Sequence, residues 1–191
     1  MRSFPWLVLI GAVALAVASC RSQEPPATPQ GPVLVGTIRE IMSGIIETSA
    51  DVLFNAVGST ITSTGMEDRE PRTDEEWDAV QHSALALAES ANLLTMPGRR
   101  VARPEEENTS IDPTELTPAQ IQLRIAENGD SWQKRVTELQ AVAIQAMKIT
   151  NERNVQGLFE IGETIDRACE GCHMEFWYPN DRRPLPGDFP R

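Results

Sequence analysis

The chain has 191 residues, a formal net charge of −11 and three cysteines. A chain of this length can bury the core of one domain. Its acidic balance argues against nucleic acid as a partner, since nucleic-acid binding requires clustered Lys and Arg side chains, and it favours protein partners that carry basic patches.

Residues 1–19 have the pattern of an export signal. Arg2 supplies a positive charge, and the apolar run from Phe4 to Ala18 is shorter than the ~20 residues that span a membrane. The run ends in the letters VASC at 17–20, which are similar to the lipobox of bacterial lipoproteins. We therefore expect a lipoprotein signal peptide at 1–19 and lipidation of Cys20. The alternative is an ordinary signal peptide with an incidental cysteine.

Residues 20–33 are rich in Pro and contain few apolar side chains. Such a segment forms an extended spacer and no core, so it is predicted to be a tether behind the lipid. The expected location is the periplasm, with Cys20 anchored to the inner or the outer membrane. Arg21 is compatible with the outer membrane, because an Asp at that position favours retention in the inner membrane of some bacteria.

The domain proper is predicted at 34–178 and begins with two amphipathic helices. In the first, from about 35 to 57, apolar residues recur at three- and four-residue steps: Ile38, Ile41, Met42, Ile46 and Leu53. Residues 58–72 are predicted to form a polar loop. A capping box from Thr73 to Glu76 then begins the second helix.

The second half starts at residue 97 with a charged, Pro-rich stretch to 116 that has no helical periodicity. A loop of this length is uncommon unless it is functional or disordered. Thr117 and Pro118 begin a short helix that Gly129 is expected to end. A capping box from Asp130 to Gln133 predicts the next helix. A last helix follows Asn151, and residues 179–191 form an irregular tail.

No segment shows the strict alternation of apolar and polar residues that is typical of a half-buried strand. The four amphipathic segments, each roughly 20 residues long, predict an all-α fold, a four-helix bundle.

The letters CEGCH at 169–173 are typical of covalent haem attachment. The two thiols form thioethers with the vinyl groups of haem, and the adjacent imidazole binds the iron. On a helix, Cys169, Cys172 and His173 share one face because they lie three and four residues apart. The prediction is one covalent haem c on the C-terminal helix, with His173 as an axial iron ligand.

Three other interpretations of the cysteine pair remain open. Zinc requires further ligands, and His82, which we expect on a helix surface, is the only other histidine. A redox-active pair is expected beside a βαβ pattern, which the sequence lacks. A disulfide across one helical turn would constrain very little.

A predicted four-helix bundle with Cys169, Cys172 and His173 near its C-terminus resembles the class II c-type cytochromes, the cytochrome c prime family. The resemblance covers about 35–178, whereas class I c-type cytochromes carry the motif near the N-terminus. It implies that His173 is the fifth iron ligand, and it makes a homodimer reasonable. The letters CHMEFWYP at 172–179 look like a lipoprotein offshoot of the family.

The resemblance also bears on the opposite side of the iron. In the low-spin branch of the family, a Met on the first helix, a few residues after an Arg, is the sixth ligand, and Arg39 and Met42 match that arrangement. In the high-spin branch the pocket holds an apolar side chain and the iron is five-coordinate. Met42 is therefore an iron ligand or a packing residue, and Arg39 contacts a haem propionate or is a solvated surface charge.

The leading hypothesis is one-electron transfer in the periplasm, with redox partner proteins that carry basic docking patches. The acidic run at 105–107 is a candidate docking site, with a plain solvated surface as the alternative. We predict an electron carrier and no enzyme, because no nucleophile–base pair or pair of carboxylates stands out. The alternatives are a haem protein that binds nitric oxide or carbon monoxide at a vacant sixth position, and a haem-free structural lipoprotein.

Overall fold

The computed structural model describes residues 31–110 and 112–181, and this part of the chain is mostly helical. The all-α prediction is confirmed at the level of fold class. The chain divides into Met1–Val33 and Leu34–Arg191, and every element below belongs to the second unit. The predicted signal peptide, the lipidation site Cys20, most of the tether and the end of the tail lie outside the described residues.

The first helical segment is continuous but changes its hydrogen-bonding pattern in the middle. α1 (Ile38–Ile41) begins with a capping box in which Thr37 and Glu40 exchange hydrogen bonds. A π-helical turn, η1 (Met42–Ile46), follows and leads into α2 (Glu47–Ala56). The N–H of Glu47 donates to the carbonyl of Met42, five residues back, so the turn holds one residue more than an α-helical turn. The sequence predicted a regular helix here.

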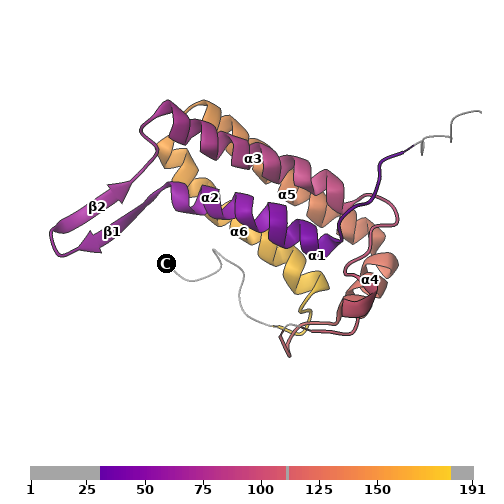
Figure 1. Ribbon diagram of the computed structural model, residues 1–191. Coiled ribbons are helices and arrows are strands. Elements are labelled where there is room, and N and C mark those ends of the chain that lie inside the picture. The colour runs from indigo at the N-terminus through magenta and orange to yellow at the C-terminus, as the bar shows by residue number, and fades with distance from the viewer. Residues whose placement is uncertain (1–30, 111, 182–191) are drawn as a thin grey trace, which may run out of the picture. The chain divides into compact units, whose positions relative to one another are not determined.

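Residues 58–72, expected as a polar loop, contain a β-hairpin instead (Figure 1). β1 (Gly58–Thr62) pairs antiparallel with β2 (Gly65–Arg69). Gly65 has a φ of +133°, a conformation that residues with a Cβ rarely adopt. The loop prediction was wrong because nearly all hairpin side chains are exposed, and a strand without a buried face shows no apolar–polar alternation.

Three long helices complete the framework: α3 (Asp74–Leu94), α5 (Gly129–Asn151) and α6 (Val155–Phe176). The predicted capping box of α3 is present, with Glu76 N–H donating to the Thr73 hydroxyl. The capping box predicted for α5 was wrong. Asn128 caps that helix without a side-chain hydrogen bond, and Gly129 begins α5 although we expected it only to end the preceding helix.

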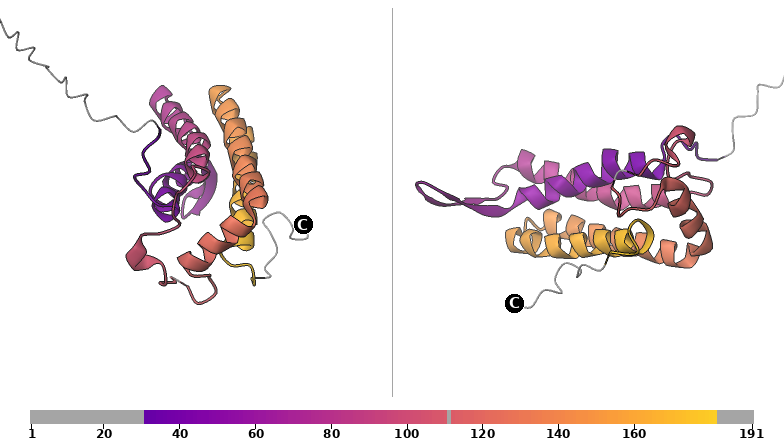
Figure 2. Two further views of the ribbon diagram at one scale, coloured as in Figure 1. Left: turned by 90° about the vertical axis from the view of Figure 1, so that its right-hand side faces the viewer. Right: turned by 90° about the horizontal axis from the view of Figure 1, so that it is seen from below.

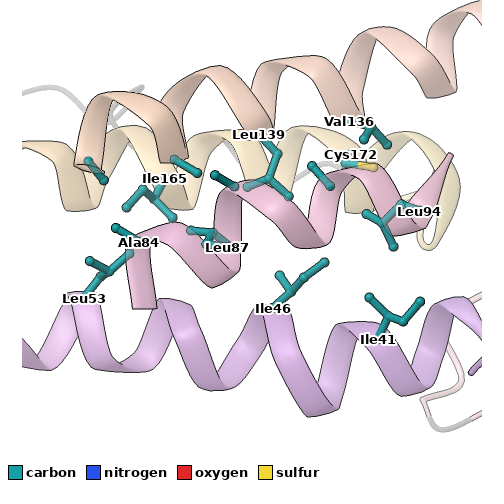
Figure 3. Packing of buried hydrophobic residues seen from close by; sticks show 14 of the residues in the cluster. Ile41, Ile46, Leu53, Ala84, Leu87, Leu94, Val136, Leu139, Ile165 and Cys172 are labelled. Carbon is teal, nitrogen blue, oxygen red and sulfur yellow. The ribbon is translucent and has the colours of Figure 1, made fainter. Parts of the chain in front are cut away.

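The long helices surround one apolar core. α3 packs against α2 and α5, and α6 packs against α5 and α2, so the four helices close a ring of contacts. Figure 3 shows one buried residue from each of them pointing toward the centre: Leu53, Leu87, Leu139 and Ile165. Trp77 near the start of α3 and Trp132 near the start of α5 are both buried.

The early part of the segment 97–116 packs against the start of α1. The carbonyls of Arg100 and Val101 accept hydrogen bonds from the N–H groups of Ile38 and Arg39, which would otherwise lack partners in the first helical turn. The buried Arg99 side chain donates to the carbonyls of Leu93 and Gly36. A segment without helical periodicity is therefore held by backbone pairing and one buried cation.

The same segment continues into two short helices, η2 (Pro104–Glu106) and α4 (Pro118–Glu127). α4 begins at the predicted Thr117 cap, and its polar start is followed by the buried Ile121. The Leu116 N–H donates to the Trp177 carbonyl over 2.8 Å, which ties the segment to the end of α6. Figure 1 and the right-hand view of Figure 2 show α4 at the end of the helices opposite the hairpin.

Candidate functional site

The C-terminal half of α6 carries the CEGCH motif on the side that faces α2 and α5. Both cysteines are free thiols; Cys172 is buried and Cys169 is partly buried. Cys172 and Val136 of α5 both belong to the apolar core cluster (Figure 3). The predicted sharing of one helix face by Cys169, Cys172 and His173 is confirmed, because all three side chains line one cavity.

Burial makes both thiols weak acids. It raises the pKa of Cys169 to about 11, and the nearby carboxylates of Asp166 and Glu170 act in the same direction. Burial raises the pKa of Cys172 to about 12 even though the Arg135 guanidinium opposes the shift. Both groups are therefore neutral thiols at pH 7, which disfavours a reactive thiolate pair.

A cavity of about 450 Å³ opens in front of these side chains. Residues four apart on the first helical segment form its opposite wall: Met42, Ile46, Ala50 and Phe54. Leu94 of α3 and Leu139 of α5 close its inner side. The volume falls in the range of about 300–1,000 Å³ that is typical of cofactor sites. Met42 and His173, near opposite ends of the chain, thus line the same space.

Met42 is the first residue of the π turn and is partly buried against the core. Single π turns inside α-helices are rare and are frequent at functional sites. Met42 and His173 line two cavities in common. Iron ligation by Met42 stays a prediction.

The second of these cavities, about 420 Å³, is the more polar and contains Arg39. Arg39 is partly buried and lines this cavity together with Met42, His173 and Tyr178. Within the described part of the chain, Arg39 forms no ion pair. A cation held half-buried beside the first cavity is suited to bind a carboxylate that extends from it.

The imidazole of His173 lies between an acidic side chain and two aromatic rings. Its Nδ1 is 3.5 Å from Oε1 of Glu170, one helical turn earlier. The other carboxylate oxygen of Glu170, Oε2, accepts a hydrogen bond of 2.7 Å from the Tyr178 hydroxyl. The centroids of the Trp177 and Tyr178 rings are each 5.9 Å from that of the imidazole. With Nδ1 facing Glu170, Nε2 is the nitrogen that remains for a metal.

Arg135 of α5 supports the motif from the other side. Its Nε lies 2.7 Å from Oε2 of Glu175, and its Nη1 lies 3.1 Å from Oε2 of Glu138. A Cβ added at Gly171 would be 3.2 Å from Nη1 of Arg135, so the glycine between the cysteines permits this close approach. Sequence analysis missed this cluster, because no spacing rule connects residues on two different helices.

Other residues singled out in the sequence lie elsewhere. His82 is exposed on α3 and lines neither of the two cavities. In the acidic run at 105–107, Glu106 lines the polar cavity and Glu107 pairs with Arg100. Glu106 therefore lies at the edge of the site, whereas Glu107 belongs to an ordinary surface ion pair.

The described ranges contain no group of three or more His, Cys, Asp or Glu side chains arranged to hold a metal ion, so the zinc interpretation gains no support. Across residues 31–110 and 112–181, no helix has both the length and the hydropathy needed to cross a membrane.

Comparison with protein-family models, with curated proteins and with solved structures found no match to this chain.

Proposed function

We propose that this protein is a c-type cytochrome that carries single electrons through one covalently attached haem. The observation that carries the proposal is the cavity of about 450 Å³ that is lined by both thiols of the CEGCH motif, by His173 and, on the opposite wall, by Met42. The motif alone is compatible with several kinds of site. Its combination with a mostly apolar cavity of cofactor size favours a mostly apolar cofactor.

The donor set fits haem. Cys169 and Cys172 supply the two thiols for thioether bonds, and Nε2 of His173 supplies an axial nitrogen. The surface of the cavity is mostly apolar, which suits the porphyrin ring, and Arg39 in the adjoining polar cavity suits a propionate. When bound, haem supplies a one-electron ferric/ferrous couple. The chain contributes orientation, exclusion of water and a charged rim.

Met42 completes the proposed coordination. Its thioether is a soft ligand that suits haem iron and raises the reduction potential. The Arg100 and Val101 carbonyls hold the first turn of α1, so the segment that carries Met42 is tied to the ordered loop 97–116. The proposed site is therefore six-coordinate and low-spin, which favours electron transfer over capture of a diatomic gas.

The proposal includes the architecture and the partners. The closed ring of contacts among α2, α3, α5 and α6 supports a four-helix bundle of the cytochrome c prime type. Exposed carboxylates on the cavity rim favour a redox partner with a basic docking surface: Glu47, Asp51 and Asp166. A lipid on Cys20 and the tether would keep the domain near membrane partners in the periplasm.

The test is a peroxidase stain of the denatured chain after expression in a host that matures c-type cytochromes, followed by optical spectra of the oxidised and reduced protein. The stain survives denaturation only if haem is covalent. A positive stain with a low-spin ferric spectrum is expected. A chain of unmodified mass with no stain would overturn the proposal and favour a haem-free lipoprotein.

A second candidate is favoured by the polar cavity beside Met42, which offers a small molecule a route to the sixth position. In that case the protein binds nitric oxide or carbon monoxide at a five-coordinate iron. The same spectra decide between the two, because a high-spin ferrous protein that binds carbon monoxide rapidly supports gas binding. Slow binding with ready electron exchange supports the electron carrier.

A further inference from the structure

Glu170 follows Cys169 in the CEGCH motif. Its carboxylate lies beside the imidazole of His173. Oε1 faces Nδ1 of His173 at 3.5 Å, and Oε2 accepts the hydroxyl hydrogen of Tyr178 at 2.7 Å. The side chains of His173 and Glu170 are 32% and 25% exposed, and Tyr178 is buried. The carboxylate is thus held from both ends and partly withdrawn from water.

A neutral imidazole carries one N–H, and its neighbour determines which nitrogen has it. A carboxylate next to Nδ1 stabilises the tautomer with the hydrogen on Nδ1, which leaves the lone pair on Nε2. A carboxylate beside Nδ1 also makes the ligand nitrogen more basic. A more basic ligand stabilises ferric over ferrous iron and therefore lowers the reduction potential.

Tyr178 gives this arrangement its geometry. It follows the end of α6, and its backbone N–H donates to the His173 carbonyl over 3.0 Å. Its ring lies against the imidazole and its hydroxyl holds Glu170. One residue therefore contacts both members of the pair and limits the rotation of each.

We propose that Glu170, held by Tyr178, is a positioning residue that fixes the tautomer and orientation of His173 and lowers the reduction potential of the site. This inference rests on the proposed haem attachment. It assigns a role to Glu170, which in the proposed site forms no thioether and does not bind the iron.

The test is the midpoint potential of the full-length holoprotein and of four variants. In Glu170→Ala the ferrous form should gain about tenfold over the ferric form, a rise of ~59 mV for one electron. Glu170→Asp, which keeps a carboxylate, should return part of the shift. Tyr178→Phe should raise the potential by less than Glu170→Ala, because the carboxylate remains but is held on one side only.

Asp166→Asn is the matched comparison, since it removes one negative charge one helical turn before Glu170 without touching the imidazole contact. A shift in Asp166→Asn as large as that in Glu170→Ala would mean that charge alone sets the potential and would overturn the positioning role. An unchanged potential in Glu170→Ala would overturn it as well.

A second measurement reports on the imidazole itself. In a Met42→Ala background, resonance Raman spectra of the ferrous protein give the iron–histidine stretching frequency, which should fall when Glu170→Ala is added, because the ligand becomes less basic. Every variant is first checked for the covalent haem stain. Absence of stain in the unmodified protein contradicts the proposed function, whereas stained variants with unchanged potential and frequency contradict only the role of Glu170.

Discussion

The cavity that the CEGCH motif lines has two walls, and they are built in different ways. The α6 wall is a regular helix in which two thiols, an imidazole and its carboxylate partner occur within five consecutive residues. The opposite wall contains a π turn, and Met42 at its first position is held by a segment whose contacts reach the loop 97–116. On α6 the common face of the two thiols and the imidazole follows from helical spacing, whereas the position of Met42 on the opposite wall depends on distant parts of the chain.

This difference predicts two kinds of response to mutation. Changes to the attachment groups on α6 should be all-or-none, since a thioether forms or does not form. Changes on the Met42 wall should be graded, because a ligand held by tertiary contacts can be displaced without loss of the haem. The following variants test that contrast.

The largest effect is expected from Cys169→Ala with Cys172→Ala. The double variant should lose all covalent haem, because no thiol remains on α6 to form a thioether, and intact-protein mass spectrometry should show a chain without the haem adduct. His82→Ala is the matched control, since it removes an exposed histidine far from the cavity and should keep the adduct. Retention of covalent haem by the double variant would exclude attachment at this motif.

Met42→Ala should keep the haem stain and change the spin state. Loss of the thioether leaves the sixth position vacant, so the low-spin ferric spectrum and its thioether-to-iron charge-transfer band should give way to a high-spin spectrum, with faster binding of carbon monoxide. Met66→Ala on the exposed hairpin serves as the control. If the unmodified protein is already high-spin, Met42 is a packing residue. Only the α6 wall would then supply groups that bind the haem.

Arg99→Ala tests whether the loop 97–116 supports the Met42 wall. The change leaves the partly buried carbonyls of Leu93 and Gly36 without a charged donor, and it should lower the free energy of unfolding by about 2–3 kcal/mol in urea titrations. It should also increase the high-spin fraction while the haem stain is unchanged.

The comparison variant for the loop is Arg103→Ala, which removes an exposed ion pair with Glu40. Its effect on unfolding should be smaller than that of Arg99→Ala, because exposed pairs are screened by water. Equal effects of the two substitutions on spin state would argue that the loop as a whole, and not the buried guanidinium, controls Met42.

The smallest effect is expected from Arg39→Gln. If Arg39 binds a propionate, its removal takes a positive charge from the neighbourhood of the iron and should lower the reduction potential by less than the rise expected for Glu170→Ala. Haem content and spin state should not change. Arg72→Gln, an exposed charge near the hairpin, gives the background value; equal shifts in the two variants would leave Arg39 as a surface charge.

Much of the α6 wall and of the helical framework could be predicted because the signals are local. The Thr73 and Thr117 caps depend on residues three apart, and both begin helices as predicted. The common face of Cys169, Cys172 and His173 follows from helical periodicity. When a pattern lies within one or two helical turns, the helix geometry fixes where its side chains lie relative to one another.

The errors and omissions have a common cause. The hairpin at 58–69 has no buried face, so no periodicity marks it. The capping box predicted at Asp130 had the right residue types, yet α5 begins earlier, at Gly129, because the chain turns through Asn128 after α4. The π turn at Met42 has no sequence signature at all.

By itself, the sequence determined the helical class, the helix periodicity and the spacing of the CEGCH residues, because these depend on neighbours within one or two turns. Only the tertiary structure decided that Met42 and His173 line one cavity, that Arg39 lies in the adjoining polar one and that Tyr178 holds Glu170 against the imidazole. Those relations join segments from both ends of the chain or depend on how the chain leaves a helix. They arise from packing around the shared core, which local spacing does not encode.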